Sequence, residues 1–126
     1  MHQEKALARA TPGTGNAVNF AGTWVNELGS KAILTQKGHA LKGTYQSAVS
    51  SGGSSAIGDL VGYVDGDLIA FTVHWRDFQS ITSWVGQLVP AVPKQTIKTM
   101  WYLVKQVDPG EEWASINAGS DSFVRA

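Results

Sequence analysis

Hydrophobic and polar residues alternate with a period of two along most of the chain from residue 19 onward. Successive side chains of a β-strand point to opposite faces, so this alternation is typical of half-buried strands. In the clearest run, one face carries Ile69, Phe71, Val73 and Trp75. Turn-forming residues separate the runs, which together predict eight strands at roughly 19–26, 30–37, 40–49, 57–65, 67–77, 81–90, 95–106 and 119–126.

The breaks between these runs have the composition of turns. Asp65-Gly66-Asp67 predicts a two-residue hairpin, because Gly tolerates the positive φ that such a turn needs. Pro90 and Pro93 bound a loop, since proline cannot donate within a central ladder, and residues 111–116 leave room for one short helical turn. Hairpin-length connections make sequential strands antiparallel neighbours, and eight such strands can close without exposed edges. The pattern therefore predicts an all-β fold, an eight-stranded antiparallel up-and-down β-barrel.

Composition narrows the possible classes of protein. A chain of 126 residues fits one domain with a real core. Only 16% of the residues are charged and the formal net charge is zero, which argues against a nucleic-acid partner and against electrostatic binding to a membrane. No apolar run approaches membrane-spanning length. The absence of Cys excludes a disulfide framework and a thiolate metal site.

Two segments differ in composition from the strands. Residues 1–17 are polar and lack the apolar core of a signal peptide, so we interpret them as a flexible tail, native or added, that precedes a barrel domain at 18–126. Residues 50–55, Ser-Ser-Gly-Gly-Ser-Ser, have the composition of a flexible loop. This loop is either a lid beside a pocket or a simple connection between two strands.

The chain contains five tryptophans, more than a small core usually needs, because each buried indole N–H requires a partner. We interpret Trp24 as a core residue at the floor of the barrel. Trp75, Trp84 and Trp101 fit a pocket wall and a core about equally well on their own. Polar residues gather at one end of the tryptophan-bearing faces: Asn26, Ser30, Tyr45, Ser47, Ser80, Thr82 and Asp121. An unpaired buried hydroxyl is costly, so an open-ended ligand cavity explains this cluster better than a filled core does.

The opposite faces of the strands carry too many apolar side chains for a free surface. They include Leu68, Met100, Tyr102 and Val104. Contiguous exposed apolar patches mark interaction sites, so these faces predict contacts between subunits.

Several short motifs follow one another over residues 19–124. They are Gly22-Thr-Trp-Val-Asn26-Glu-Leu28-Gly-Ser30, Gly43-Thr-Tyr45-Gln-Ser47-Ala-Val49, Phe71-Thr-Val-His-Trp75, Ser80-Ile-Thr82-Ser-Trp84-Val-Gly86-Gln87, Trp101-Tyr-Leu103, Trp113 and Asp121-Ser-Phe123. Each motif is weak alone, but the ordered set resembles the avidin/streptavidin family. Members of this family are established examples of eight-stranded barrels that hold one small ligand.

The resemblance implies biotin as the ligand, with no cofactor, no metal and no catalytic residue. The ureido oxygen of biotin can accept several hydrogen bonds, and the matching donors are Asn26, Ser30 and Tyr45, which converge as in an oxyanion hole. The two ureido N–H groups need acceptors, and Ser47 and Asp121 match the positions that supply them. An ionised acceptor strengthens such hydrogen bonds.

The rest of the implied pocket surrounds the ring and the tail of biotin. Thr82 matches the hydroxyl that faces the thioether sulfur. An aromatic box with aliphatic side chains between its walls matches Trp75, Trp84, Trp101, Leu28, Val49 and Leu103. Ser80 and the backbone near Ser51 match the groups that hold the valerate carboxylate, and Phe78 is placed to cap the mouth.

The resemblance also bears on assembly and location. Trp113 matches the tryptophan that reaches from one subunit into the pocket of its neighbour, which favours a homotetramer over a dimer. Trp113 could instead cover its own barrel. We further expect a secreted or extracellular protein; this chain carries no signal peptide, and removal of one would account for that.

Three alternatives remain beside biotin binding. A lipocalin-like carrier of another small apolar ligand would predict a longer chain with a C-terminal helix. A small hydrolase would pair His74 with Asp77 or Ser80, but His74 alternates away from Trp75 and the polar cluster, so no base meets a nucleophile. The sequence also has no metal-ligand cluster and no Gly-rich phosphate loop. A purely structural module would leave the convergent hydroxyls unexplained.

Overall fold

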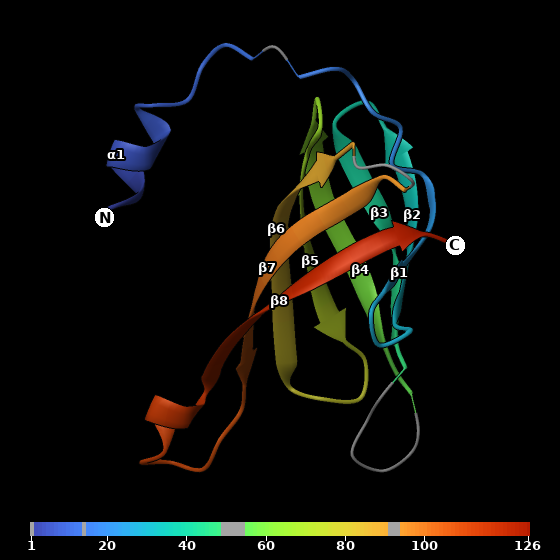
Figure 1. Cartoon of the computed structure of the whole chain (residues 1–126). Helices are drawn as coiled ribbons and strands as arrows, with labels where there is room; N and C mark the ends of the chain where they lie inside the picture. Colours follow the sequence, from blue (N-terminus) through green and yellow to red (C-terminus); the bar gives the residue numbers. More distant parts are fainter. Residues whose placement is uncertain (1, 14, 49–54, 91–93) are drawn as a thin grey trace.

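A computed structural model describes residues 2–13, 15–48, 55–90 and 94–126 of the chain. Its central feature is a closed antiparallel barrel in which strand order follows the chain and β1 pairs with β8 (Figure 1). The eight strands are β1 (Gly22–Asn26), β2 (Lys31–Lys37), β3 (Ala40–Ser47), β4 (Ala56–Asp65), β5 (Leu68–Trp75), β6 (Ser80–Val89), β7 (Thr96–Lys105) and β8 (Ile116–Arg125). The prediction of an eight-stranded up-and-down barrel is confirmed.

The strand ends differ from the predicted ones where local pattern and pairing disagree. The first strand begins at Gly22, whose φ of +121° breaks the extended backbone, and not at residue 19. The last strand begins at Ile116 and not at 119, because its pairing with β7 continues to Val104. The turn at Gly66 adopts the expected positive φ of +57°. The short helical turn predicted within 111–116 is the 3-10 helix η1 (Glu112–Ala114).

The inward-facing side chains of the strands form one continuous core. It consists of Phe20, Trp24, Ala32, Leu34, Leu41, Tyr45, Leu60, Val64, Ile69, Phe71, Val73, Trp75, Trp84, Leu88, Ile97 and Phe123. Phe20 and Trp24 are fully buried near the start of β1. The indole Nε1–H of Trp24 donates to the carbonyl oxygen of Phe20 at 2.8 Å, and the amide of Phe20 donates to Gln36 at 2.8 Å. Trp24 is therefore a core residue, and with Phe20 it fills the barrel near the start of β1.

The segment before the barrel contains a short helix, α1 (Gln3–Leu7), that the sequence pattern did not suggest. None of its residues is buried, and Figure 1 shows it apart from the barrel. Within the part of the chain that the structure describes, no helix is long and apolar enough to cross a membrane.

The outer face of the later strands is apolar and exposed. Leu68, Met100, Tyr102 and Val104, which the alternation places outward, are 51%, 55%, 54% and 44% exposed. Further exposed apolar side chains lie on β4, β6 and β8: Ile57, Val61, Tyr63, Ile81, Val85, Val89 and Ile116. This apolar outer face, on which we expect contacts between subunits, therefore extends over β4 to β8 of the single chain.

Candidate ligand-binding site

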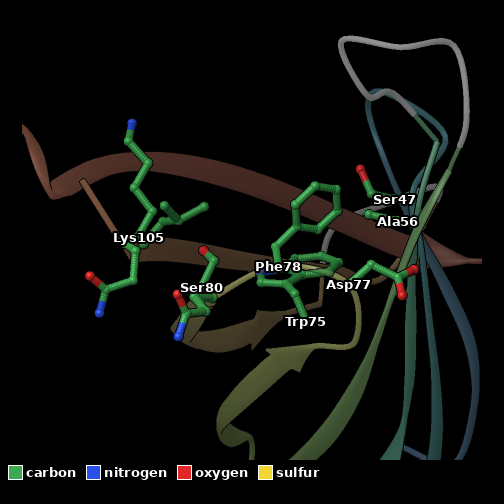
Figure 2. Close-up of a pocket in the computed structure, with 10 residues that line it drawn as sticks. Ser47, Ala56, Trp75, Asp77, Phe78, Ser80 and Lys105 are labelled. Carbon is green, nitrogen blue, oxygen red and sulfur yellow. The ribbon is translucent and has the colours of Figure 1, made fainter. Parts of the chain in front are cut away.

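The site lies at the end of the barrel where β1, β3, β5 and β7 end. A cavity of about 650 Å³ opens there (Figure 2). Its lining comprises Ser47, Ala56, Trp75, Asp77, Phe78, Gln79, Ser80, Leu103, Lys105 and Gln106. Trp75 forms part of its wall and Phe78 lies above Trp75 in Figure 2. Strand polarity thus brings residues distant in the sequence to one opening.

Asn26, Ser30 and Tyr45 meet in a buried polar cluster below this opening. The side-chain oxygen of Asn26 accepts the backbone N–H groups of Leu28 at 3.0 Å and Ser30 at 2.9 Å. This fixes the amide so that its Nδ2 points to the Tyr45 hydroxyl, at 3.4 Å. The Ser30 hydroxyl accepts the N–H of Ala48 at 3.1 Å and also hydrogen-bonds Tyr45. These three predicted donors are therefore brought together and held in fixed orientations.

The Tyr45 hydroxyl remains protonated at neutral pH. Burial, and then the nearby charge of Asp121, raise the pKa of Tyr45 far above its usual range, although the hydrogen bond with Ser30 acts in the opposite direction. The ring stacks on Trp84 with centroids 4.7 Å apart and meets Trp75 edge-on at 5.6 Å. Packing thus positions a neutral hydroxyl that can donate to a ligand acceptor.

Asp121 supplies a half-buried carboxylate beside the same cluster. Its Oδ2 accepts the indole Nε1–H of Trp84 at 2.9 Å, and its backbone oxygen accepts the Thr99 hydroxyl at 3.0 Å. Burial raises the pKa of Asp121, and the neighbouring carboxylate of Glu27 raises it further against the lowering effect of Trp84. Burial also acts to raise the pKa of Glu27, but hydrogen bonds with the Ser122 amide, with its own backbone amide and with Asp121 together outweigh this and lower it. Asp121 is therefore a strong, localised acceptor.

Two tryptophans of the site, Trp75 and Trp84, donate their indole N–H groups to other side chains of the barrel. Trp75 Nε1 donates to the Thr82 hydroxyl at 3.0 Å, so Thr82 and Trp75 are oriented together. Trp101 is half-buried and pairs with Trp84 across β6 and β7. Gly119 lies opposite Trp101 on β8, and a Cβ at Gly119 would collide with the indole ring. The absence of a side chain there gives Trp101 its place in the wall.

A model of the avidin family matches residues 14–126. This chain belongs to the avidin family. It is 30% identical to avidin-related protein 4/5 of Gallus gallus, over 95% of this chain and 87% of that protein. Afifavidin of Afifella pfennigii is 36% identical, over 80% of this chain and 65% of that protein. The crystal structure of xenavidin is similar with a TM-score of 0.76 and 30% identity, over 88% of this chain and 100% of that chain.

Membership of the avidin family confirms the resemblance seen in the sequence and sets the lipocalin-like alternative aside. Proteins of this family bind ligands without catalysing a reaction, so the protein is not an enzyme. The position of His74 agrees with this, because it lies exposed on the outside of β5, opposite Ile81. Among the described residues, no group of His, Cys, Asp or Glu is arranged to hold a metal ion.

Four of the predicted site residues line the cavity of this chain. Ser47, Trp75, Ser80 and Leu103 line it. The hydroxyl of Ser80 donates to the carbonyl oxygen of Val104 at 2.9 Å, so its proton is directed at backbone and not at the opening.

Other predicted residues are not brought into the cavity of the single chain. Leu28 is 64% exposed in the turn between β1 and β2, and Trp113 is 85% exposed on η1. Trp113 therefore does not cover its own barrel. Val49 and Ser51, with the loop at 50–55 proposed as a lid or a connection, lie in a segment of which residues 49–54 are outside the described residues.

The sequence analysis did not assign three charged residues at this end of the avidin-family barrel to the ligand-binding site. The carboxylate of Glu27 accepts the backbone N–H of Ser122, the residue after Asp121. Asp77 and Lys105 line the cavity. Alternation contains a signal for one of them, because Lys105 continues the inward series of Trp101 and Leu103 on β7. The positions of Glu27 and Asp77 in turns carry no such periodicity.

Proposed function

We propose that the protein binds biotin, with high affinity and without catalysis, in the open end of the barrel. The observation that carries the proposal is the buried cluster of Asn26, Ser30 and Tyr45 with the Asp121 carboxylate beside it. Buried polar groups are normally paired. A site with several oriented donors and one adjacent strong acceptor fits a cyclic urea, whose oxygen accepts hydrogen bonds and whose nitrogens donate them.

Each part of biotin has a matching group in the described site. The donors Asn26, Ser30 and Tyr45 face the ureido oxygen, and Asp121 and Ser47 accept from its two nitrogens. Thr82 faces the thioether sulfur at the level of Trp75, to which it is hydrogen-bonded. Aromatic and aliphatic side chains enclose the bicyclic ring: Trp75, Trp84, Trp101 and Leu103. Removing apolar surface from water between these side chains and the ring contributes roughly 25 cal/mol of binding free energy per Å².

We further propose that the protein is a homotetramer in which Trp113 enters the pocket of a neighbouring subunit. Trp113 is 85% exposed on η1, which is unusual for an indole on a surface that no partner covers. The apolar outer faces of β4 to β8 supply the contact area that assembly requires. Leu28, exposed at the same end of the barrel, would become covered by the ligand or by the partner.

The likeness to avidin-related proteins also supports a secreted or extracellular location. Measuring the protein in the culture medium and in the cell fraction of its source would test this directly.

Thermal unfolding with and without biotin tests the proposed function. A ligand at a thousandfold its Kd stabilises the folded state by about 4 kcal/mol, which for a domain of this size raises Tm by roughly 10–20 °C. Mass spectrometry of the purified protein would first establish that no biotin is already bound. An unchanged Tm in biotin-free protein would reject biotin as the ligand and favour a different small molecule in the same barrel.

A further inference from the structure

Lys105 is the last residue of β7 and lies at the mouth of the cavity. Ile97, Thr99, Trp101 and Leu103 occupy the inward positions of β7 before it, and Lys105 continues that series by two residues. The β6–β7 register places Lys105 directly opposite Ser80, and both residues line the cavity. The side chain therefore belongs to the opening and not to the outer surface of the barrel.

The charge of Lys105 has no anionic partner in the described part of the chain. Its Nζ donates to the neutral side-chain oxygen of Asn117 at 2.9 Å. The ion pair found among the described residues joins Arg76 to Asp59, on another part of the surface. An ammonium group has three donors, so the Asn117 contact orients Lys105 and leaves its charge uncompensated.

The described residues that line the cavity include one cation and one anion, Lys105 and Asp77. Figure 2 shows them on opposite sides of Trp75 and Phe78. An acidic group emerging between the aromatic side chains would therefore be attracted to the Lys105 side and repelled from the Asp77 side. This asymmetry gives the opening a preferred direction for a negatively charged tail.

The hydroxyl that the family resemblance assigns to the tail carboxylate is already engaged. Ser80 donates its proton to the Val104 carbonyl at 2.9 Å, and in this orientation it presents only oxygen lone pairs to the cavity. A carboxylate needs donors, because it is an acceptor alone when ionised. Directly across the ladder, Lys105 offers both donors and positive charge.

We propose that Lys105 pairs with the carboxylate of the ligand tail and determines specificity for the free acid over neutral amides and esters. The inference rests on the proposed biotin site, which directs the valerate tail to this opening. A solvent-accessible ion pair contributes modestly and is screened by salt. The preference for acid over amide is therefore set by a small electrostatic difference and not by shape.

Competition binding with biotin and with biotin primary amide tests the proposal. The ratio of their Kd values is measured in the unaltered protein, in Lys105→Gln and in Lys105→Glu. We expect Lys105→Gln to lower the preference for the acid about two- to fivefold with little change for the amide, and Lys105→Glu to lower it further. Asp77→Asn should raise the preference for the acid, and 0.5 M salt should weaken it.

Lys98 provides the matched control, because it lies on the same strand but alternates to the exposed outer face. Lys98→Gln should leave the acid-to-amide ratio unchanged. An equal loss for both ligands in Lys105→Gln, or an unchanged ratio, would overturn the role of Lys105 while leaving biotin binding intact. Failure of the unaltered protein to bind either ligand would overturn both proposals.

Discussion

Replacing Asp121 with Asn separates the charge of this side chain from its shape. Asn retains an oxygen that can accept the Trp84 indole N–H, now 2.9 Å from Asp121 Oδ2. It loses the negative charge that we propose strengthens the hydrogen bond from a ureido nitrogen. Charged acceptors contribute about 1.5–3 kcal/mol, against about 0.5–1.5 kcal/mol for neutral ones. The difference of about 1–2 kcal/mol predicts a fall in biotin affinity of roughly 5- to 30-fold.

The same substitution should not destabilise the ligand-free protein at neutral pH. Burial and Glu27 raise the pKa of Asp121, so its protonated form is favoured in the folded state relative to the unfolded state. Stability from this group is present at acidic pH and is lost as pH rises through the folded-state pKa. At pH 7 the ionised carboxylate therefore opposes folding, and Asp121→Asn should keep or raise the Tm while it lowers affinity.

Competition binding and differential scanning calorimetry of the same samples provide the assay. Asp121→Ala leaves both the Trp84 N–H and a ureido N–H unpaired, so we expect a loss of about 2–4 kcal/mol, roughly 30- to 700-fold in Kd. Ser80→Ala is the matched control, and should cost less than about fivefold because its hydroxyl donates to backbone. Equal losses for Asp121→Ala and Ser80→Ala, or an unchanged affinity in Asp121→Asn, would refute the assigned geometry.

Three further predictions address assembly and the pocket wall. Trp113→Lys should weaken the tetramer and speed biotin release, as measured by light scattering and by off-rates; full assembly with an unchanged off-rate would remove the cross-subunit role. Gly119→Val should displace Trp101, because a Cβ already collides with its ring, and should lower Tm and biotin affinity together; an unaltered Tm would contradict this packing. Tyr45→Phe should weaken biotin binding roughly 5- to 30-fold by removing a donor and leaving Asn26 Nδ2 with one partner fewer, and retention of full affinity would exclude Tyr45 as a donor.

The barrel could be predicted from the sequence because its determinants are local. Each strand alternates over adjacent residues, and the Gly66 turn joins neighbours in the chain. The strand ends were harder to place, because the start of β8 at Ile116 depends on pairing with Val104 of β7. Residues 116–118, Ile-Asn-Ala, are too few for their alternation to distinguish a strand from the end of the preceding turn.

The sequence predicts which side chains of the site point into the barrel, but it does not predict their hydrogen bonds. The alternation places Trp101 and Leu103 inward, and the same rule applied one step further would have found Lys105. The direction of the Ser80 hydroxyl depends on a carbonyl 24 residues away, which no local pattern encodes. The environment that we propose for Trp113 includes a partner chain, so neither the sequence pattern nor a single chain could predict it.

Calorimetric titration of biotin into biotin-free protein tests the central claim most directly. The account predicts saturable, exothermic binding with one biotin per chain and a Kd well below micromolar, because several oriented hydrogen bonds form in a site enclosed by aromatic side chains. The same titration with Asp121→Ala should give markedly weaker binding at the same stoichiometry. Absence of saturable binding by the unaltered, folded protein would contradict the assignment of biotin to this barrel.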